Sequence, residues 1–149
     1  HTVTQFLNAS GPSRVGGRQP AHCTAVGKAI LAYNQDAEVD LMSRKTKYSI
    51  ANRAQLATEL AKVRSHGVAF EREESVPGFG CVAAPIGRQG EAVAAVSVCG
   101  PMNRMAFEQL TAPVRMTAMG IWRNAEDSRV APTLQPMRPL RMGPALQYA

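Results

Sequence analysis

GFGCVAAPIGRQGEAVAAVSVCGP, residues 78–101, is the most ordered pattern in the sequence. Residues 79–86 and 92–99 are apolar, small and bounded by glycine or proline, which predicts two buried strands of a covered sheet. Residues 88–90 between them end in glycine, and a three-residue hairpin loop favours glycine at its last position, where φ is positive. The stretch therefore predicts an antiparallel hairpin.

This three-residue turn also predicts which residues face one another across the hairpin. It places Cys81 opposite Ser97 and Phe79 opposite Cys99. Side chains alternate along a strand, so these four share one weakly polar face of the sheet. The other face is apolar and carries Val82, Ala84, Val96 and Val98. The polar face is either the floor of a ligand cavity or ordinary core packing of two thiols and a hydroxyl.

Helical patterns precede the hairpin. After an expected strand at residues 2–7 and a loop at 8–19, residues 22–33 have helical periodicity with Thr24 as N-cap. The expected inward stripe is Val26, Ala29, Ile30 and Tyr33. Gly27 destabilises such a helix by about 1 kcal/mol relative to alanine, so we expect something to approach its backbone closely.

Two more helices and a strand are expected before the hairpin. A short helix is expected at residues 36–44, and a longer one begins at the cap Asn52 and stops at Gly67. The buried stripe of the longer helix is Leu56, Leu60 and Val63. Residues 68–71 follow as a strand, with Val68 and Phe70 on one face and Ala69 and Glu71 on the other.

After the hairpin, a helical region opens at Asn103. Its inward row is Phe107, Leu110, Val114, Ala118 and Ile121. Pro113 interrupts this row, so we expect a kink or a restart near Thr111. Residues 127–149 are rich in proline and lack periodicity, which predicts a largely irregular tail.

Composition limits the classes of function. The chain has 149 residues, enough for one domain with its own core, and a net charge of +6 that would permit contact with nucleic acid. Three scattered cysteines predict neither a disulfide framework nor a metal knuckle, and they favour a reducing compartment. No apolar run approaches the roughly 18 residues of a membrane span, so a cytoplasmic protein is expected. The first residue is His1, and the chain resembles a piece of something longer.

Catalytic signatures are mostly missing. There is no Walker loop, nucleophile elbow or HExxH motif. One weak enzymatic alternative uses Cys81 as nucleophile with His22 as base and Glu71 as its orienting group. An equally weak alternative is a metal site formed by His22, Cys23, Cys81 and Cys99.

Three segments carry a resemblance to a known family: PAHCTAVGKAILAY, ANRAQLATELAKVRSHGVAFEREESVPGFGCVAAPI and AVAAVSVCGPMNR. From about Pro20 to Arg104 the chain resembles the effector-binding domain of the IclR family of bacterial transcriptional regulators. The resemblance implies an α+β (α/β) fold with a GAF-like curved antiparallel sheet flanked by helices. It implies that residues 1–126 form the effector-binding domain without its first strand or strands, that 127–149 form the tail, and that the winged helix-turn-helix DNA-binding domain is absent from this chain.

The resemblance also implies a ligand site. Ligand contacts would come from the backbone amides of Ala25 and Val26 and from four side chains: Glu71, Cys81, Ser97 and Cys99. Cys99 departs from the more usual serine of the family. A helix N-terminus offers amide donors and partial positive charge to a ligand carboxylate, which agrees with this arrangement. Two alternatives stay open: Glu71 as part of a solvated acidic cluster, and His22 as a structural residue beside the helix start.

These observations predict a sensor that binds a small organic or aromatic acid and performs no chemistry. No cofactor and no metal are expected. The expected partners are the effector, further copies in a homodimer or homotetramer, and DNA only through the missing N-terminal domain. The rival hypotheses are a cysteine-dependent hydrolase using Cys81 on the same scaffold, and a ligand-free domain that serves only assembly.

Overall fold

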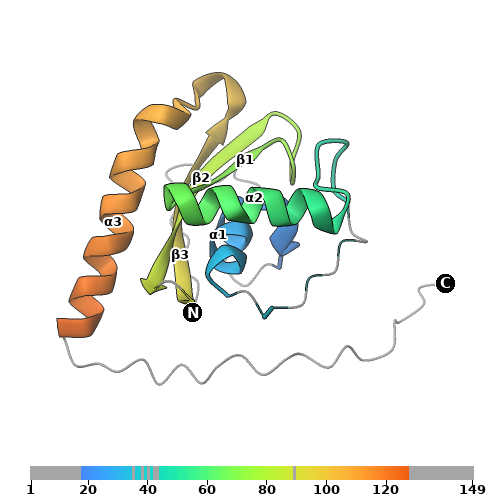
Figure 1. The fold of residues 1–149 in the computed structure, drawn as a ribbon. Helices are drawn as coiled ribbons and strands as arrows, with labels where there is room; N and C mark the ends of the chain where they lie inside the picture. Colours follow the sequence, from blue (N-terminus) through green and yellow to red (C-terminus); the bar gives the residue numbers. More distant parts are fainter. Residues whose placement is uncertain are drawn as a thin grey trace.

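An antiparallel sheet lies between two layers of helix (Figure 1). The computed structural model describes residues 18–34, 36, 37, 39, 41, 44–88 and 90–127. Within them the sheet has the strand order β1-β2-β3, formed by β1 (Ala69–Arg72), β2 (Phe79–Arg88) and β3 (Glu91–Pro101). The helices are η1 (Ala21–Cys23), α1 (Ala25–Tyr33), α2 (Arg53–His66), η2 (Met102–Arg104) and α3 (Phe107–Asp127). The α+β class expected from the sequence is confirmed.

The β2–β3 hairpin exists, but its predicted register is wrong by two residues. Cys81 faces Cys99, and Ser97 faces Ala83. Arg88 pairs with Glu91, so the loop holds two residues rather than three, and this moves the pairing by one residue. A register shift between Ile86 and Gly87 moves the pairing by one residue more. Because the total offset is even, each side chain stays on the face predicted for it.

Gly90 at the hairpin tip has the positive φ that the turn prediction requires, with a value of 96°. Gly87 marks the register shift, where a Cβ would lie 2.3 Å from the carbonyl oxygen of Glu91. Only glycine permits this approach of the two strands. The predicted glycine position was therefore correct, while the irregularity beside it was not foreseen.

Helix α1 begins after the predicted cap Thr24 but buries a different face than expected. Residues 21–23 form a 3-10 turn, and Thr24 then caps α1 by accepting a hydrogen bond from the Gly27 N–H at 3.1 Å. Val26 is 36% exposed, against the prediction, whereas the helix buries Ala25, Ala29 and Ala32. Alanine side chains let a helix lie close to a sheet. The prediction relied on large apolar residues and therefore did not identify the alanine face as the buried one.

The close approach expected at Gly27 is present, and the chain itself makes it. A Cβ at this position would lie 2.3 Å from the carbonyl oxygen of Ala21 in η1. Glycine therefore allows the 3-10 turn to pack on the first turn of α1.

Helix α2 matches its prediction. Asn52 accepts a hydrogen bond from the Gln55 N–H at 2.9 Å, and Gly67 ends the helix in the left-handed region with φ of 72°. Leu56 and Val63 are buried, and Leu60 packs beside them. Local capping signals were sufficient to define this element.

Other expected helices fared less well. The stretch at 36–44 is described only at positions 36, 37, 39, 41 and 44, and none of these is helical. Helix α3 contains Pro113 and continues through it without a restart. Its buried row holds Val114 and Ala118, while Ile121 is 42% exposed and Trp122 packs in its place. The expected strand at 2–7 and residues 128–149 of the expected tail lie outside the described residues. Asp127, expected to begin the tail at 127–149, is instead the last residue of α3.

Two apolar clusters cover the two faces of the sheet. On one face, α1 and α2 pack over Ala69, Cys81 and Ala83. On the other, α3 packs over Val68, Val82, Ala84 and Ile86 (Figure 1). Val82, Ala84 and Ile86 of β2 thus face α3, and Cys81 and Ala83 face α1. The face under α1 carries the polar side chains of the candidate site.

Candidate functional site

A row of three predicted site residues crosses the sheet on the face beneath α1. Glu71 of β1 pairs with Cys81 of β2, and Cys81 pairs with Cys99 of β3. Facing residues in antiparallel strands project from the same face, so the carboxylate and both sulfur atoms lie on one side. In the adjacent row, Ser97 faces Ala83. The structure therefore brings the four predicted side chains onto one face.

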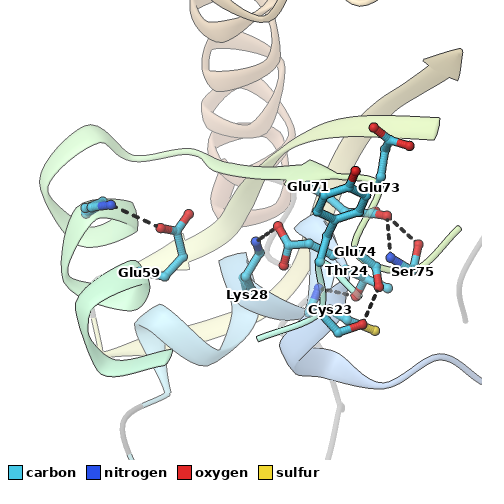
Figure 2. Close-up of polar contacts among 12 residues, drawn as sticks. Cys23, Thr24, Lys28, Glu59, Glu71, Glu73, Glu74 and Ser75 are labelled. Carbon is cyan, nitrogen blue, oxygen red and sulfur yellow. Dashed lines mark hydrogen bonds and ion pairs between the residues drawn. The ribbon is translucent and has the colours of Figure 1, made fainter. Parts of the chain in front are cut away.

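Glu71 is a buried carboxylate with its own hydrogen-bond donors. Its exposure is 2%, and its Oε1 accepts a hydrogen bond from the Ser75 N–H at 3.0 Å and another from the Ser75 hydroxyl (Figure 2). The alternative of a solvated acidic cluster is wrong for this residue. Two donors on one oxygen fix the carboxylate in place at the end of the Glu71–Cys81–Cys99 row.

Cys81 and Cys99 form a disulfide, which corrects the expectation that the cysteines form none. The sequence separation is 18, and the two Cα atoms are 4.1 Å apart. Cys23 is a free, buried cysteine. The disulfide was not predicted because the predicted register, wrong by two residues, placed Ser97 and not Cys99 opposite Cys81.

The disulfide bears on both weak alternatives of the sequence analysis. A bonded sulfur has no thiolate, so Cys81 is not a nucleophile in this state. Among the described residues, no group of three or more histidines, cysteines or acidic residues could hold a metal ion. His22 is buried in η1, directly ahead of the start of α1.

Ser97 and Cys99 lie two residues apart on β3, at the edge of the described sheet. The Ser97 Oγ is 3.9 Å from the Cys99 Sγ. Ser97 is half-buried and Cys99 is exposed, so this end of the row is open to small molecules. A hydroxyl that both donates and accepts is suited to orienting a polar ligand.

The start of α1 lies over this face. Ala25 belongs to the same apolar cluster as Cys81, and its exposure is 1%. The amides of Ala25 and Val26 are in the first helical turn, where N–H groups have no partner within the helix. Thr24 caps the next amide, that of Gly27. The helix thus presents donors and partial positive charge beside the polar face.

A buried ion pair near this face was not predicted. Lys28 of α1 is 1% exposed, and its Nζ donates to the Glu74 Oε1 at 2.6 Å (Figure 2). Burial raises the pKa of the Glu74 carboxyl above its usual value, while the Lys28 charge acts in the opposite direction. The pair ties α1 to the segment that follows β1, which also carries Ser75.

Further hydrogen bonds hold this segment. The Thr46 hydroxyl donates to the Glu73 carbonyl at 2.7 Å, and the Ser49 hydroxyl donates to the Glu74 carbonyl at 2.7 Å. The Glu73 carboxylate accepts from the Gly78 N–H at 2.9 Å. The Thr46 and Ser49 contacts join segments that are distant in sequence, so no local pattern could have revealed them. Together with Lys28 they position Ser75 against Glu71.

No helix in the part of the chain that the structure describes is long and apolar enough to cross a membrane.

Comparisons with known proteins identify the family of the chain. Residues 2–123 match the family described as bacterial transcriptional regulator IclR C-terminal. The HTH-type transcriptional regulator BhcR of Paracoccus denitrificans is 36% identical over 104 residues, which are 65% of this chain and 37% of that protein. The chain spans less than half the length of BhcR and of four further curated regulators that it matches.

Solved structures show the same fold. The IclR protein of Thermotoga maritima superposes with a TM-score of 0.69 and 30% identity, over 82% of this chain and 53% of that one. The inducer-binding domain of the PobR transcription factor from Acinetobacter, solved as a double mutant with 3-hydroxybenzoic acid, gives 0.66 and 25%, over 77% and 73%. With the family match, these likenesses show that the chain belongs to the C-terminal domain family of IclR-type bacterial transcriptional regulators.

Proposed function

We propose that this chain is the effector-sensing part of an IclR-type transcriptional regulator and that it binds a small organic or aromatic acid. The observation that carries the proposal is the Glu71–Cys81–Cys99 row, with Ser97 beside it, beneath the start of α1. The effector carboxylate lies at the amides of Ala25 and Val26, where helix N-termini stabilise anions. The polar side chains of the sheet hold the rest of the molecule.

The position of Glu71 favours an effector with a hydroxyl group. A buried carboxylate near a bound anion is unfavourable unless a donor lies between them. One Glu71 oxygen accepts from Ser75, and a ligand hydroxyl would supply a donor to the carboxylate. The related Acinetobacter domain was solved with 3-hydroxybenzoic acid, which has a carboxylate and a hydroxyl on one ring and so supports this class.

Binding would act on an assembly. An effector shifts an equilibrium only if it prefers one arrangement of subunits, so we propose a cytoplasmic homodimer or homotetramer that contacts DNA through a separate domain. No catalytic step is proposed. The cysteine-hydrolase alternative would require the reduced form, because Cys81 is bonded in the disulfide.

Calorimetry on the chain with reduced cysteines tests the proposal. The panel is 3-hydroxybenzoate, benzoate and pyruvate, and we expect the hydroxybenzoate to bind most tightly. Ser97→Ala removes one hydroxyl from the site and is expected to weaken binding about tenfold, the effect of one hydrogen bond.

Ser65→Ala is the matched control, because Ser65 is exposed on α2 away from the sheet face. Its affinity should equal that of the unmodified chain. The proposal fails if no acid in the panel binds while Cys81 is intact, or if Ser97→Ala and Ser65→Ala bind equally well.

A further inference from the structure

The Cys81–Cys99 bridge joins two strands that are already paired without it. Val82 faces Val98 on one side of the bridge, and Gly80 faces Gly100 on the other. Opening the bridge therefore leaves the two sulfur atoms close together, since backbone pairing still holds the strands. Closing the bridge again requires little loss of conformational entropy, because the two thiols are already close, and this favours a reversible reaction.

The two sulfur atoms differ in access. Cys99 is exposed on β3, whereas Cys81 is 8% exposed on the central strand. A small thiol can therefore reach Cys99 more readily. The third cysteine is kept apart: burial, with the charges of Glu71 and Glu74, raises the pKa of the Cys23 thiol to about 11. Cys23 stays protonated and does not compete in exchange.

We propose that Cys81 and Cys99 are a reversible thiol–disulfide pair in the effector site, exchanging with a low-molecular-weight thiol such as glutathione. A glutathione thiolate attacks the Cys99 sulfur, forms a mixed disulfide with it and releases Cys81 as a thiolate, which takes up a proton. A second glutathione then attacks the mixed disulfide and releases the Cys99 thiol and oxidised glutathione. The protein disulfide gains two electrons and two protons, and two glutathione molecules lose them.

The reduced and oxidised forms present different chemical groups to an effector on this face of the sheet. The reduced form offers two S–H groups beside the Ser97 hydroxyl, and the oxidised form offers none. The bridge also fixes the end of β3 against β2. The reduced form is therefore the one that binds an effector more tightly, a consequence that rests on the proposed function.

Counting thiols tests the pair without any effector. The full chain is equilibrated with excess reduced or oxidised glutathione, quenched with acid, alkylated in denaturant and weighed by mass spectrometry. We expect three alkylated cysteines after reduction and one, Cys23, after oxidation. Cys99→Ser leaves Cys81 without a partner, so after oxidation Cys81 should be either alkylated or bound to one glutathione, which the mass reveals, and no internal bridge should form. Cys23→Ser should give two alkylated cysteines after reduction and none after oxidation.

Two results would overturn the pair. Three free thiols in both buffers would mean that the disulfide does not form, and one free thiol in both would mean that it is permanent. For the effect on binding, 3-hydroxybenzoate should bind the reduced form about tenfold more tightly than the oxidised form. Equal affinity would refute that effect. If the thiol count switches and no acid of the panel binds either form, the redox pair stands and the proposed function is what fails.

Discussion

Among single residues, Lys28 is the least expected. It is a charged side chain with 1% exposure on the first long helix, and its partner Glu74 lies 46 positions away. A buried charge is tolerated only when it is paired, because leaving water is unfavourable for an isolated ion. The Lys28–Glu74 pair therefore specifies how α1 sits against the segment after β1, and this segment carries Ser75.

Removing one partner of this pair should be strongly destabilising. Lys28→Met leaves the Glu74 carboxylate buried without a counter-charge, and we expect a loss of about 3 kcal/mol in the free energy of unfolding at pH 7. The double variant with Glu74→Gln should lose less than Lys28→Met alone, because it leaves no unpaired charge buried. Urea denaturation of the four proteins measures this cycle.

The surface pair Lys62–Glu59 serves as control, with side chains 61% and 26% exposed. Lys62→Met should change the free energy of unfolding by no more than about 0.5 kcal/mol. A loss below about 1 kcal/mol for Lys28→Met would contradict the structural role given to the buried pair.

Sequence patterns identified some of these residues and could not identify others. Glu71, Cys81, Ser97 and Cys99 were all named from the sequence, because family motifs and strand alternation point to them. Lys28 and Ser75 were missed, since their roles depend on which distant segments meet in the fold. The disulfide was missed for a smaller reason, a register that local turn rules alone do not determine.

At the scale of elements, local signals were the reliable ones. Thr24, Asn52 and Gly67 mark helix ends through hydrogen bonds and dihedrals within a few residues, and each was predicted correctly. The buried faces of α1 and α3 depend on how closely each helix packs on the sheet. Val26 and Ile121 were expected inside and are exposed, because alanines and Trp122 fill those contacts.

The cap of α2 gives an element-scale prediction. Asn52→Ala removes the acceptor for the Gln55 N–H, and we expect a loss of about 1 kcal/mol in the free energy of unfolding. Thr58→Ala, at an exposed site within the same helix, is the control and should be nearly neutral. Thermal or urea denaturation compares them. Equal stability of Asn52→Ala and the unmodified chain would show that the cap contributes nothing.

In the molecule as a whole, the sheet separates two cores that differ in chemical composition. The α3 face is apolar, and the α1 face combines apolar packing with the carboxylate, hydroxyl and sulfur groups of the site. The sequence predicted this division correctly, since it depends on the alternation of side chains along β2. It did not predict how the segment after β1 is tied down.

Stability should depend on pH through Glu74. Its folded-state pKa is raised above the usual 4.5, so between that value and the folded value the folded chain binds more protons than the unfolded chain. The contribution of this group is therefore fully present below pH 4.5 and is lost as pH rises through the folded value. The measurement is urea denaturation across pH, comparing the unmodified chain with Glu74→Gln.

Other carboxyl groups titrate in both proteins and cancel in the difference between them. The stability advantage of the unmodified chain over Glu74→Gln should shrink as pH rises through this window. An advantage that grows with pH would mean that the Lys28 charge outweighs burial in setting the pKa of Glu74.

The alternation of side chains along the hairpin determines which length changes its tip can accept. Adding or deleting two residues there would lengthen or shorten the hairpin by one residue in each strand and leave every side chain on its present side of the sheet. A change of one residue would turn β3 over, placing Ser97 and Cys99 under α3 and Val96 and Val98 under α1. Among related chains, hairpin tips that differ in length by an even number should therefore keep a polar site beneath α1, and tips that differ by one should lose it.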